Sequence, residues 1–474
     1  MAKWEINPNL TYYSSLRLRN FRGFRVRKQI PFAPLTFLLG PNSSGKSSIF
    51  DSLLLLSQSD FNPSMTVNQE PNWIGDLVDM GSFKDTVYNH KTELPIEINV
   101  EISLPDLRKN KKNIYDSPNI ALEFQIRTTR DEPGGRLSVF RLTDLASKQS
   151  ITINYSKTQL SVKILGERIT FDIKDKRPIR DLDYYSFRRY IYEIREYIEK
   201  YIDENPEKFF RRKAAWNRII QNLVVTRSQL ISGAERVTSG RGAPRRWYPT
   251  GDERSYRRYF PFHLRVPTFS DVEPQMLQND YDSPYYPRRY RHRLSESLPS
   301  ILKKLDIASS INPYQLSPYH SAINIEDSVT GITSNLIDVG YGASQVIPIL
   351  RACMSPSDGP LFVEQPEIHL HPKAQSIVAE VLCETSNYRQ VVVETHSVHM
   401  INRARILVAE GKLNPEHVII NLVYRKKSGS YVYPMHLLKN GEFASKWPDG
   451  FDFFDERYQD TMRLLQLKHL NGKQ

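Results

Sequence analysis

One eight-residue stretch constrains the fold more than any other part of the chain. Residues 40–47 read Gly-Pro-Asn-Ser-Ser-Gly-Lys-Ser and match the pattern G-x-x-x-x-G-K-[ST] at every position. The apolar run LTFLL (35–39) precedes them and KSSIFDSLLLLSQS (46–59) follows, so the order is strand, loop, helix. The glycines let the backbone curl toward phosphate oxygens, and the helix N-terminus adds its positive dipole end. The sequence therefore predicts a phosphate-binding loop in an α/β fold.

The residues of this loop have separate expected roles. Lys46 is expected to reach the β- and γ-phosphates of ATP, and the Ser47 hydroxyl to ligate Mg²⁺. The predicted nucleotide-binding residues of the loop are Gly40, Pro41, Asn42, Ser43, Ser44, Gly45, Lys46, Ser47 and Ser48.

Two later apolar strands end in polar residues. LFVEQPE (361–367) has an acid, Glu364, at its strand end, where it is expected to hold Mg²⁺ together with Ser47. This pattern is weak alone, since many buried strands end in an acid, but strong after a phosphate loop. VVVETHS (391–397) ends at His396, either as a polar strand cap or as a group that reaches the γ-phosphate.

A second glycine loop enters a helix at Asp338-Val-Gly-Tyr-Gly342-Ala-Ser344-Gln. Its helix N-terminus suits an anion, as does that of the phosphate loop. Two such helix starts for one nucleotide make sense if the second serves a neighbouring subunit.

These motifs, with the N-terminal Asn20-Phe-Arg22-Gly-Phe24, resemble in kind and order those of ABC ATPases of the SMC, RecF and OLD group. The resemblance covers roughly residues 14–90 and 330–455. It implies two nucleotide-binding units that dimerise head to tail around two ATPs. It also implies that Gly342 and Ser344 contact the γ-phosphate in trans, that His396 is the switch histidine, and that Arg22 lies near the nucleotide.

One position departs from the pattern of that group. VEQPE aligned on Asp-Glu-Pro places Glu364 at the Mg²⁺ acid and Gln365 at the catalytic base. An amide cannot take up a proton as a carboxylate does. Either Glu367 supplies the carboxylate, or hydrolysis is slow and the protein mainly holds ATP.

The formal net charge of +12 is concentrated in one segment. Residues 208–293 hold 18 Lys and Arg against 7 Asp and Glu, and the arginines are interleaved with aromatic residues. Such a segment is either a solvated face or a surface for DNA, RNA or an acidic partner. The expected organisation is an ABC-type head split by this basic, largely helical insertion: residues 1–175 with the phosphate loop and an antiparallel sheet, 176–305 as the insertion, and 306–474 with the remaining motifs.

Other features of the sequence narrow the setting. Cys353 and Cys383 fit two small core residues in a reducing compartment. We expect no signal peptide and no membrane span, and a cytoplasmic location. His369 and His371 could be read as a metal pair, but no third ligand accompanies them, and no acid pair suggests a nuclease.

The sequence leaves three functions to compare. The first is an ATP-hydrolysing core subunit of a bacterial anti-phage system, resembling the ATPase subunits of Septu or PARIS and controlling a separate effector nuclease. The second is a RecF-like or SMC-like repair ATPase that clamps DNA. The third is an ATP-sensing scaffold that hardly hydrolyses. All three predict a dimer-based homo-oligomer with ATP and Mg²⁺.

Overall fold

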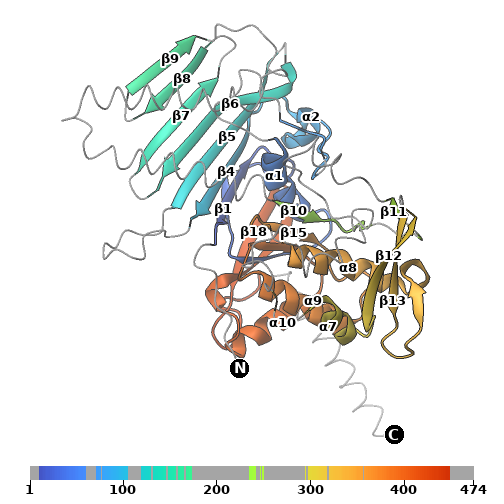
Figure 1. The fold of residues 1–474 in the computed structure, drawn as a ribbon. Helices are drawn as coiled ribbons and strands as arrows, with labels where there is room; N and C mark the ends of the chain where they lie inside the picture. Colours follow the sequence, from blue (N-terminus) through green and yellow to red (C-terminus); the bar gives the residue numbers. More distant parts are fainter. Residues whose placement is uncertain are drawn as a thin grey trace, which may run out of the picture.

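Two large sheets organise the computed structural model (Figure 1). The described residues are 10–59, 71–104, 119–172, 234–249 and 294–448, apart from short gaps inside the last four ranges. Within them, the first sheet has the order β2-β1-β4-β5-β6-β7-β8-β9 and the second the order β10-β15-β16-β3-β17-β18. A small sheet of β11, β12, β13 and β14 stands apart from both.

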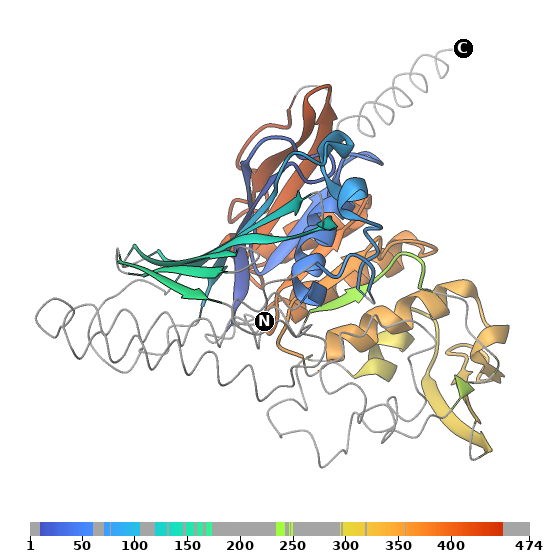
Figure 2. The ribbon, with the colours of Figure 1, turned by 90° about the horizontal axis from the view of Figure 1, so that it is seen from above.

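The eight-stranded sheet is antiparallel throughout. Alternating apolar residues in the expected strands between 95 and 175 form it, as predicted, and its far strands project away from the rest of the molecule (Figure 2). Its strands are β1 (Tyr12–Arg19), β2 (Lys28–Pro31), β4 (Ile96–Ser103), β5 (Asn119–Thr129), β6 (Glu132–Asp144), β7 (Gln149–Tyr155), β8 (Gln159–Ile164) and β9 (Glu167–Asp172).

The six-stranded sheet is parallel except for its last pair, β17 and β18. Short runs of apolar residues build it, because its central strands are covered on both faces. Its strands are β3 (Leu35–Leu39), β10 (Glu235–Val237), β15 (Leu361–Glu364), β16 (Val391–Glu394), β17 (Val418–Lys426) and β18 (Gly429–His436). The small sheet comprises β11 (Tyr248–Pro249), β12 (Ser310–Ser317), β13 (His320–Glu326) and β14 (Thr333–Asn335).

Alternate residues of the central strands divide two cores. Leu38, Phe362 and Val392 join the core shared with α1 and the antiparallel sheet. Phe37 and Val363 point to the other face, which is covered by helices of the C-terminal part. The helices are α1 (Lys46–Ser59), α2 (Phe83–Thr86), α7 (Leu298–Lys304), α8 (Tyr341–Met354), α9 (Pro372–Thr385) and α10 (Val398–Ala409), with 3₁₀ turns η1 (Tyr88–His90), η5 (Leu336–Asp338) and η6 (Pro415–His417).

The α/β fold class predicted for an ABC-type head, a mixed sheet with helices and an antiparallel β lobe, is confirmed by these sheets. The helices expected over 178–230 lie outside the described residues. Two described pieces of the range 176–305 pack within the head: β10 pairs with β15, and α7 contributes Ile301 and Leu302 to the second core. The basic insertion therefore contains residues that belong to the central sheet.

Two smaller expectations can be compared with the fold. Cys353 and Cys383 are buried and unpaired, as two small core residues should be. Along the described ranges, no helix combines the length and the apolar character that crossing a membrane requires.

Candidate functional site

The phosphate loop runs from the end of β3 into α1. Its glycines adopt positive φ angles, 146° at Gly40 and 113° at Gly45, a region that side chains disfavour. A Cβ at Gly40 would lie 2.0 Å from the carbonyl oxygen of Val423, and one at Gly45 would lie 2.9 Å from Ser430 Oγ. The loop is therefore fixed against the β17–β18 hairpin and has the shape that the sequence predicted.

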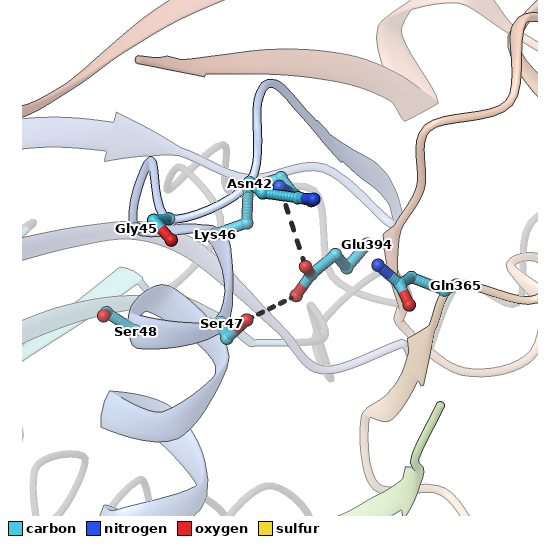
Figure 3. A pocket seen from close by; sticks show the side chains of 8 residues that line it. Asn42, Gly45, Lys46, Ser47, Ser48, Gln365 and Glu394 are labelled. Carbon is cyan, nitrogen blue, oxygen red and sulfur yellow. Dashed lines mark hydrogen bonds and ion pairs between the residues drawn. The ribbon is translucent and has the colours of Figure 1, made fainter. Parts of the chain in front are cut away.

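A pocket of about 350 Å³ opens beside this loop (Figure 3). It is lined by Asn42, Ser43, Gly45, Lys46, Ser47, Ser48, Gln365 and Glu394. Six of these residues come from the predicted nucleotide-binding set. The other two lie at the ends of β15 and β16, so three parallel strands deliver the walls of the pocket.

Lys46 and Ser47 both face Glu394. The Lys46 ammonium donates to the carbonyl oxygens of Gly40 (3.0 Å) and Pro41 (2.8 Å) and lies 3.8 Å from Glu394 Oε1. The Ser47 hydroxyl donates to Glu394 Oε2 at 3.0 Å. Burial lowers the pKa of Lys46 and raises that of Glu394, and the attraction between the two charges opposes both shifts. The pair therefore places one cation and one carboxylate where phosphates and Mg²⁺ would meet.

Glu364, the acid predicted to hold Mg²⁺, is bound on both oxygens. Arg236 donates from Nε to Oε1 at 2.8 Å and also contacts it through Nη2, while the backbone N–H of Ser239 donates to Oε2 at 3.1 Å. Arg236 also lies 3.5 Å from Asp51 on α1. The hydroxyl of Ser47 is hydrogen-bonded to Glu394 rather than to Glu364, so the sequence-based pairing of Ser47 with Glu364 is not the contact that the structure shows.

Gln365 enters the pocket from a constrained backbone. Its φ angle is 41°, a left-handed value that is uncommon outside glycine. Its N–H donates to the carbonyl oxygen of Glu394 (2.7 Å), and its own carbonyl accepts from Arg241 Nη2 (3.2 Å). Both ends of this residue are thus held, and its side chain lines the pocket at the position expected for a catalytic base.

Glu367 turns toward the loop after β16. Its Oε2 accepts from the Thr395 hydroxyl at 2.8 Å, and its Oε1 accepts from the backbone N–H of His396 at 2.6 Å. Burial raises the pKa of Glu367, whereas these hydrogen bonds lower it. The carboxylate therefore holds the loop that carries the predicted switch histidine, and it does not line the pocket.

His396 presents an open nitrogen. The ring is half-buried, and its Nε2 is buried without a hydrogen-bond partner among the described residues. Burial lowers the pKa of His396, and the nearby Lys46 charge lowers it further. A neutral imidazole with a free nitrogen beside Lys46 suits a hydrogen bond to a phosphate oxygen. The buried Ser44 hydroxyl in the loop is likewise without a partner in the described structure.

Other predicted residues lie outside the pocket lining. Arg22 Nη1 donates to Asp51 Oδ2 at 2.5 Å, so its guanidinium is directed to the side of α1. Gly342 and Ser344 lie in the first turn of α8, and neither lines the phosphate-loop pocket. A Cβ on Gly342 would lie 3.3 Å from the carbonyl oxygen of His369. His371 caps α9, and in the described ranges no group of three or more His, Cys, Asp and Glu side chains forms a metal cluster.

The residues present fit ATP and Mg²⁺. The loop offers a buried lysine and an unpartnered hydroxyl, and the neighbouring strand offers an unpartnered imidazole nitrogen. Mg²⁺ is commonly bound through one or two carboxylates together with substrate phosphates, and Ser47 with Glu394 supplies two oxygen donors 3.0 Å apart. Bound Mg²⁺ would neutralise charge that develops on the phosphates.

Sequence reasoning missed three residues of this site: Arg236, Arg241 and Glu394. Glu394 ends an apolar strand, VVVE, in the same way as Glu364 ends LFVE, so the signal was present. The two arginines were counted as part of a basic segment, and only the pairing of β10 with β15 places them at the site.

Comparisons with known proteins support an ATPase. A family described as "AAA ATPase domain" matches residues 12–235, and one described as "AAA domain, putative AbiEii toxin, Type IV TA system" matches residues 250–402. No curated protein sequence matches the chain. Both halves of the chain are therefore similar to AAA-type ATPase domains, and the motifs at 40–47 and 361–397 fall inside the matched ranges.

Several solved structures are similar over most of the chain. An Smc head bound to the C-winged helix domain of ScpA has 14% identity and a TM-score of 0.44, covering 90% of this chain and 98% of that one. An Smc head with an extended coiled coil bound to the C-terminal domain of ScpA, derived from Pyrococcus furiosus, has 15% identity and a TM-score of 0.39, covering 90% and 97%. An SMC head domain from Thermotoga maritima has 13% identity and a TM-score of 0.34, covering 89% and 98%.

Proposed function

We propose that this protein is the ATP-binding and ATP-hydrolysing core subunit of a bacterial anti-phage defence complex, in which ATP-dependent dimerisation controls a separate effector nuclease. The observation that carries the ATPase part is the convergence of Lys46, Ser47, Glu394 and His396 from three neighbouring strands. The defence part is supported more broadly, by a sequence match to a family whose description refers to a toxin of a toxin–antitoxin system.

In this proposal the signature helix α8 acts on a second copy of the chain. Gly342 and Ser344 are absent from the lining of the pocket in their own chain, as expected if they complete the site of a partner subunit. Asn42, Ser43 and Ser47 are exposed beside Lys46 and leave room for such a partner. The basic segment 208–293, most of which lies outside the described residues, is the proposed surface for DNA, RNA or the effector.

A second candidate, a scaffold that senses ATP and hardly hydrolyses it, is favoured by one observation. Gln365 occupies the place of the base, and both oxygens of Glu367 are engaged by the Thr395–His396 loop. We propose slow turnover in either case, so the two candidates differ in whether hydrolysis is needed for the biological effect.

The test compares wild type with Lys46→Ala. The variant should lose ATP binding in calorimetry, because the β- and γ-phosphates lose their main charge partner. ATP should shift the wild type, but not the variant, from monomer to dimer in sedimentation. Cells that carry the gene with its native neighbours should resist phage, and the Lys46→Ala cells should not. Retained ATP affinity in the variant would refute the site, and unchanged phage resistance would refute the defence role alone.

A further inference from the structure

Arg241 is a buried arginine just beyond β10. Its residue is 1% exposed, although it falls in the most basic stretch of the sequence. Its Nη1 donates to the carbonyl oxygen of Glu364 at 3.0 Å and its Nη2 to that of Gln365 at 3.2 Å. Its Nε donates to the side-chain oxygen of Gln345 at 3.2 Å. One guanidinium therefore connects the end of β15 with a side chain of α8.

The strand arm of this contact controls Gln365. The carbonyl of Gln365 is held by Arg241, its N–H is held by the carbonyl of Glu394, and its backbone has a φ of 41°. A side chain that projects from a backbone fixed at both ends has few positions to choose from. The Gln365 amide therefore enters the phosphate-loop pocket at a place that depends on Arg241.

The helix arm reaches the signature turn. Gln345 directly follows Ser344 in the first turns of α8, and both residues are almost fully buried. The Gln345 side-chain N–H donates to the Ser344 hydroxyl at 3.5 Å, while its oxygen accepts from Arg241. A shift of the start of α8 would therefore pull on the same guanidinium that holds Gln365.

We propose that Arg241 is a positioning residue that couples the signature end of α8 to the placement of Gln365 in the ATP pocket. The proposal rests on the proposed function, in which a second subunit's ATP binds at the start of α8. Engagement of that ATP would be transmitted through Gln345 and Arg241 to the end of β15. The planar guanidinium suits this role because its donors keep a fixed fork, whereas a lysine offers one mobile ammonium.

The experiment separates coupling from simple stabilisation. Arg241→Lys keeps the charge but loses the fork, and Gln345→Met removes only the helix arm at similar side-chain volume. Each should leave ATP affinity in calorimetry within about threefold of wild type and lower kcat at least about tenfold, with KM little changed. The double variant should be no slower than Arg241→Lys alone, because residues in one network are not additive.

Arg389→Lys is the matched control. Arg389 is also fully buried and binds the Gly359 carbonyl and Glu235, away from the pocket lining. It should lower the melting temperature and leave kcat per folded molecule unchanged. If wild-type turnover is too slow to time, the ATP concentration at half-maximal dimerisation is measured instead, and it should rise about tenfold in Arg241→Lys and Gln345→Met only.

Three results would overturn the coupling: additive losses in the double variant, loss of ATP affinity in step with kcat, or equal kcat losses in Arg241→Lys and Arg389→Lys. These failures differ from failure of the proposed function. In that case wild-type protein would neither bind ATP nor dimerise with it, whatever residue stands at 241.

Discussion

The Ser47 hydroxyl donates a 3.0 Å hydrogen bond to Glu394, a residue 347 positions later in the chain. The bond joins the first turn of α1 to the end of β16, which lies beside β3 in the central sheet. It makes Glu394, rather than Glu364, the carboxylate in contact with the hydroxyl that is expected to ligate Mg²⁺. Glu364 is held by Arg236 and by the Ser239 N–H.

The first prediction distinguishes these two acids. Glu394→Gln removes the charge that faces Ser47 and Lys46, so the Mg²⁺ concentration that gives half-maximal ATP binding should rise about tenfold or more. Glu364→Gln should mainly lower thermal stability, because Arg236 would lose its charged partner in a mostly buried place. Calorimetry across a Mg²⁺ series measures the first effect, with Glu380→Gln on α9 as a control distant from the pocket. A larger Mg²⁺ shift in Glu364→Gln would restore the assignment made from the sequence.

A second prediction concerns the signature turn. A Lys46→Ala subunit mixed with a Ser344→Arg subunit should form heterodimers with one intact composite site. Each homodimer should be inactive, since one lacks the phosphate lysine and the other carries a bulky cation in the first turn of α8. We expect up to about half of the wild-type nucleotide binding in heterodimers purified with two different tags. Verified heterodimers with no activity would show that the site is built within one chain.

Turnover supplies a third prediction. Gln365→Glu should speed ATP hydrolysis, by up to about 10²–10⁴-fold, because a positioned carboxylate can accept the proton of the attacking water. Glu367→Gln should weaken ATP binding together with turnover, since its two oxygens hold the Thr395–His396 loop. Steady-state kinetics and calorimetry on both variants check this. If Glu367 is the base instead, Glu367→Gln abolishes turnover with ATP affinity intact, and Gln365→Glu changes little.

The fourth prediction concerns pH. Burial lowers the pKa of His396 below its ordinary value near 6.5, so the unfolded chain binds a proton more readily than the folded protein does. The stability that neutral His396 contributes is complete above about pH 6.5 and is lost as pH falls toward its lower folded pKa. His396→Gln should therefore flatten the decline in melting temperature between about pH 6.5 and 5. A decline as steep in the variant as in wild type would show that other groups cause it.

Local signals made part of the site predictable. The loop at 40–47 and the helix that follows could be read directly, because glycine spacing and apolar periodicity are properties of adjacent residues. The contact between Ser47 and Glu394 could not, because it depends on β16 lying beside β3. Arg241 escaped for a related reason: among 18 basic residues nothing local separates a buried guanidinium from solvated ones.

The predicted roles of the acids changed most between sequence and structure. Glu364 and Glu367 were both assigned to chemistry, yet both are hydrogen-bonded to neighbouring protein groups. Hydrogen-bond partners so distant in sequence cannot be inferred from one chain without its fold. The roles of all these residues in turnover stay predictions for the variants above to decide.

The position of β3 in the central sheet has a consequence for biosynthesis. Leu35 on β3 lies in register with Val391 of β16 on one side and with Val418 of β17 on the other. A ribosome must add about 350 further residues before either neighbour exists, which takes roughly 20–70 s at about 5–20 residues per second. During that time this apolar strand has neither of its sheet partners. The nascent chain is thus a natural client for chaperones, and a truncated translation product that ends before β16 lacks a finished ATP site.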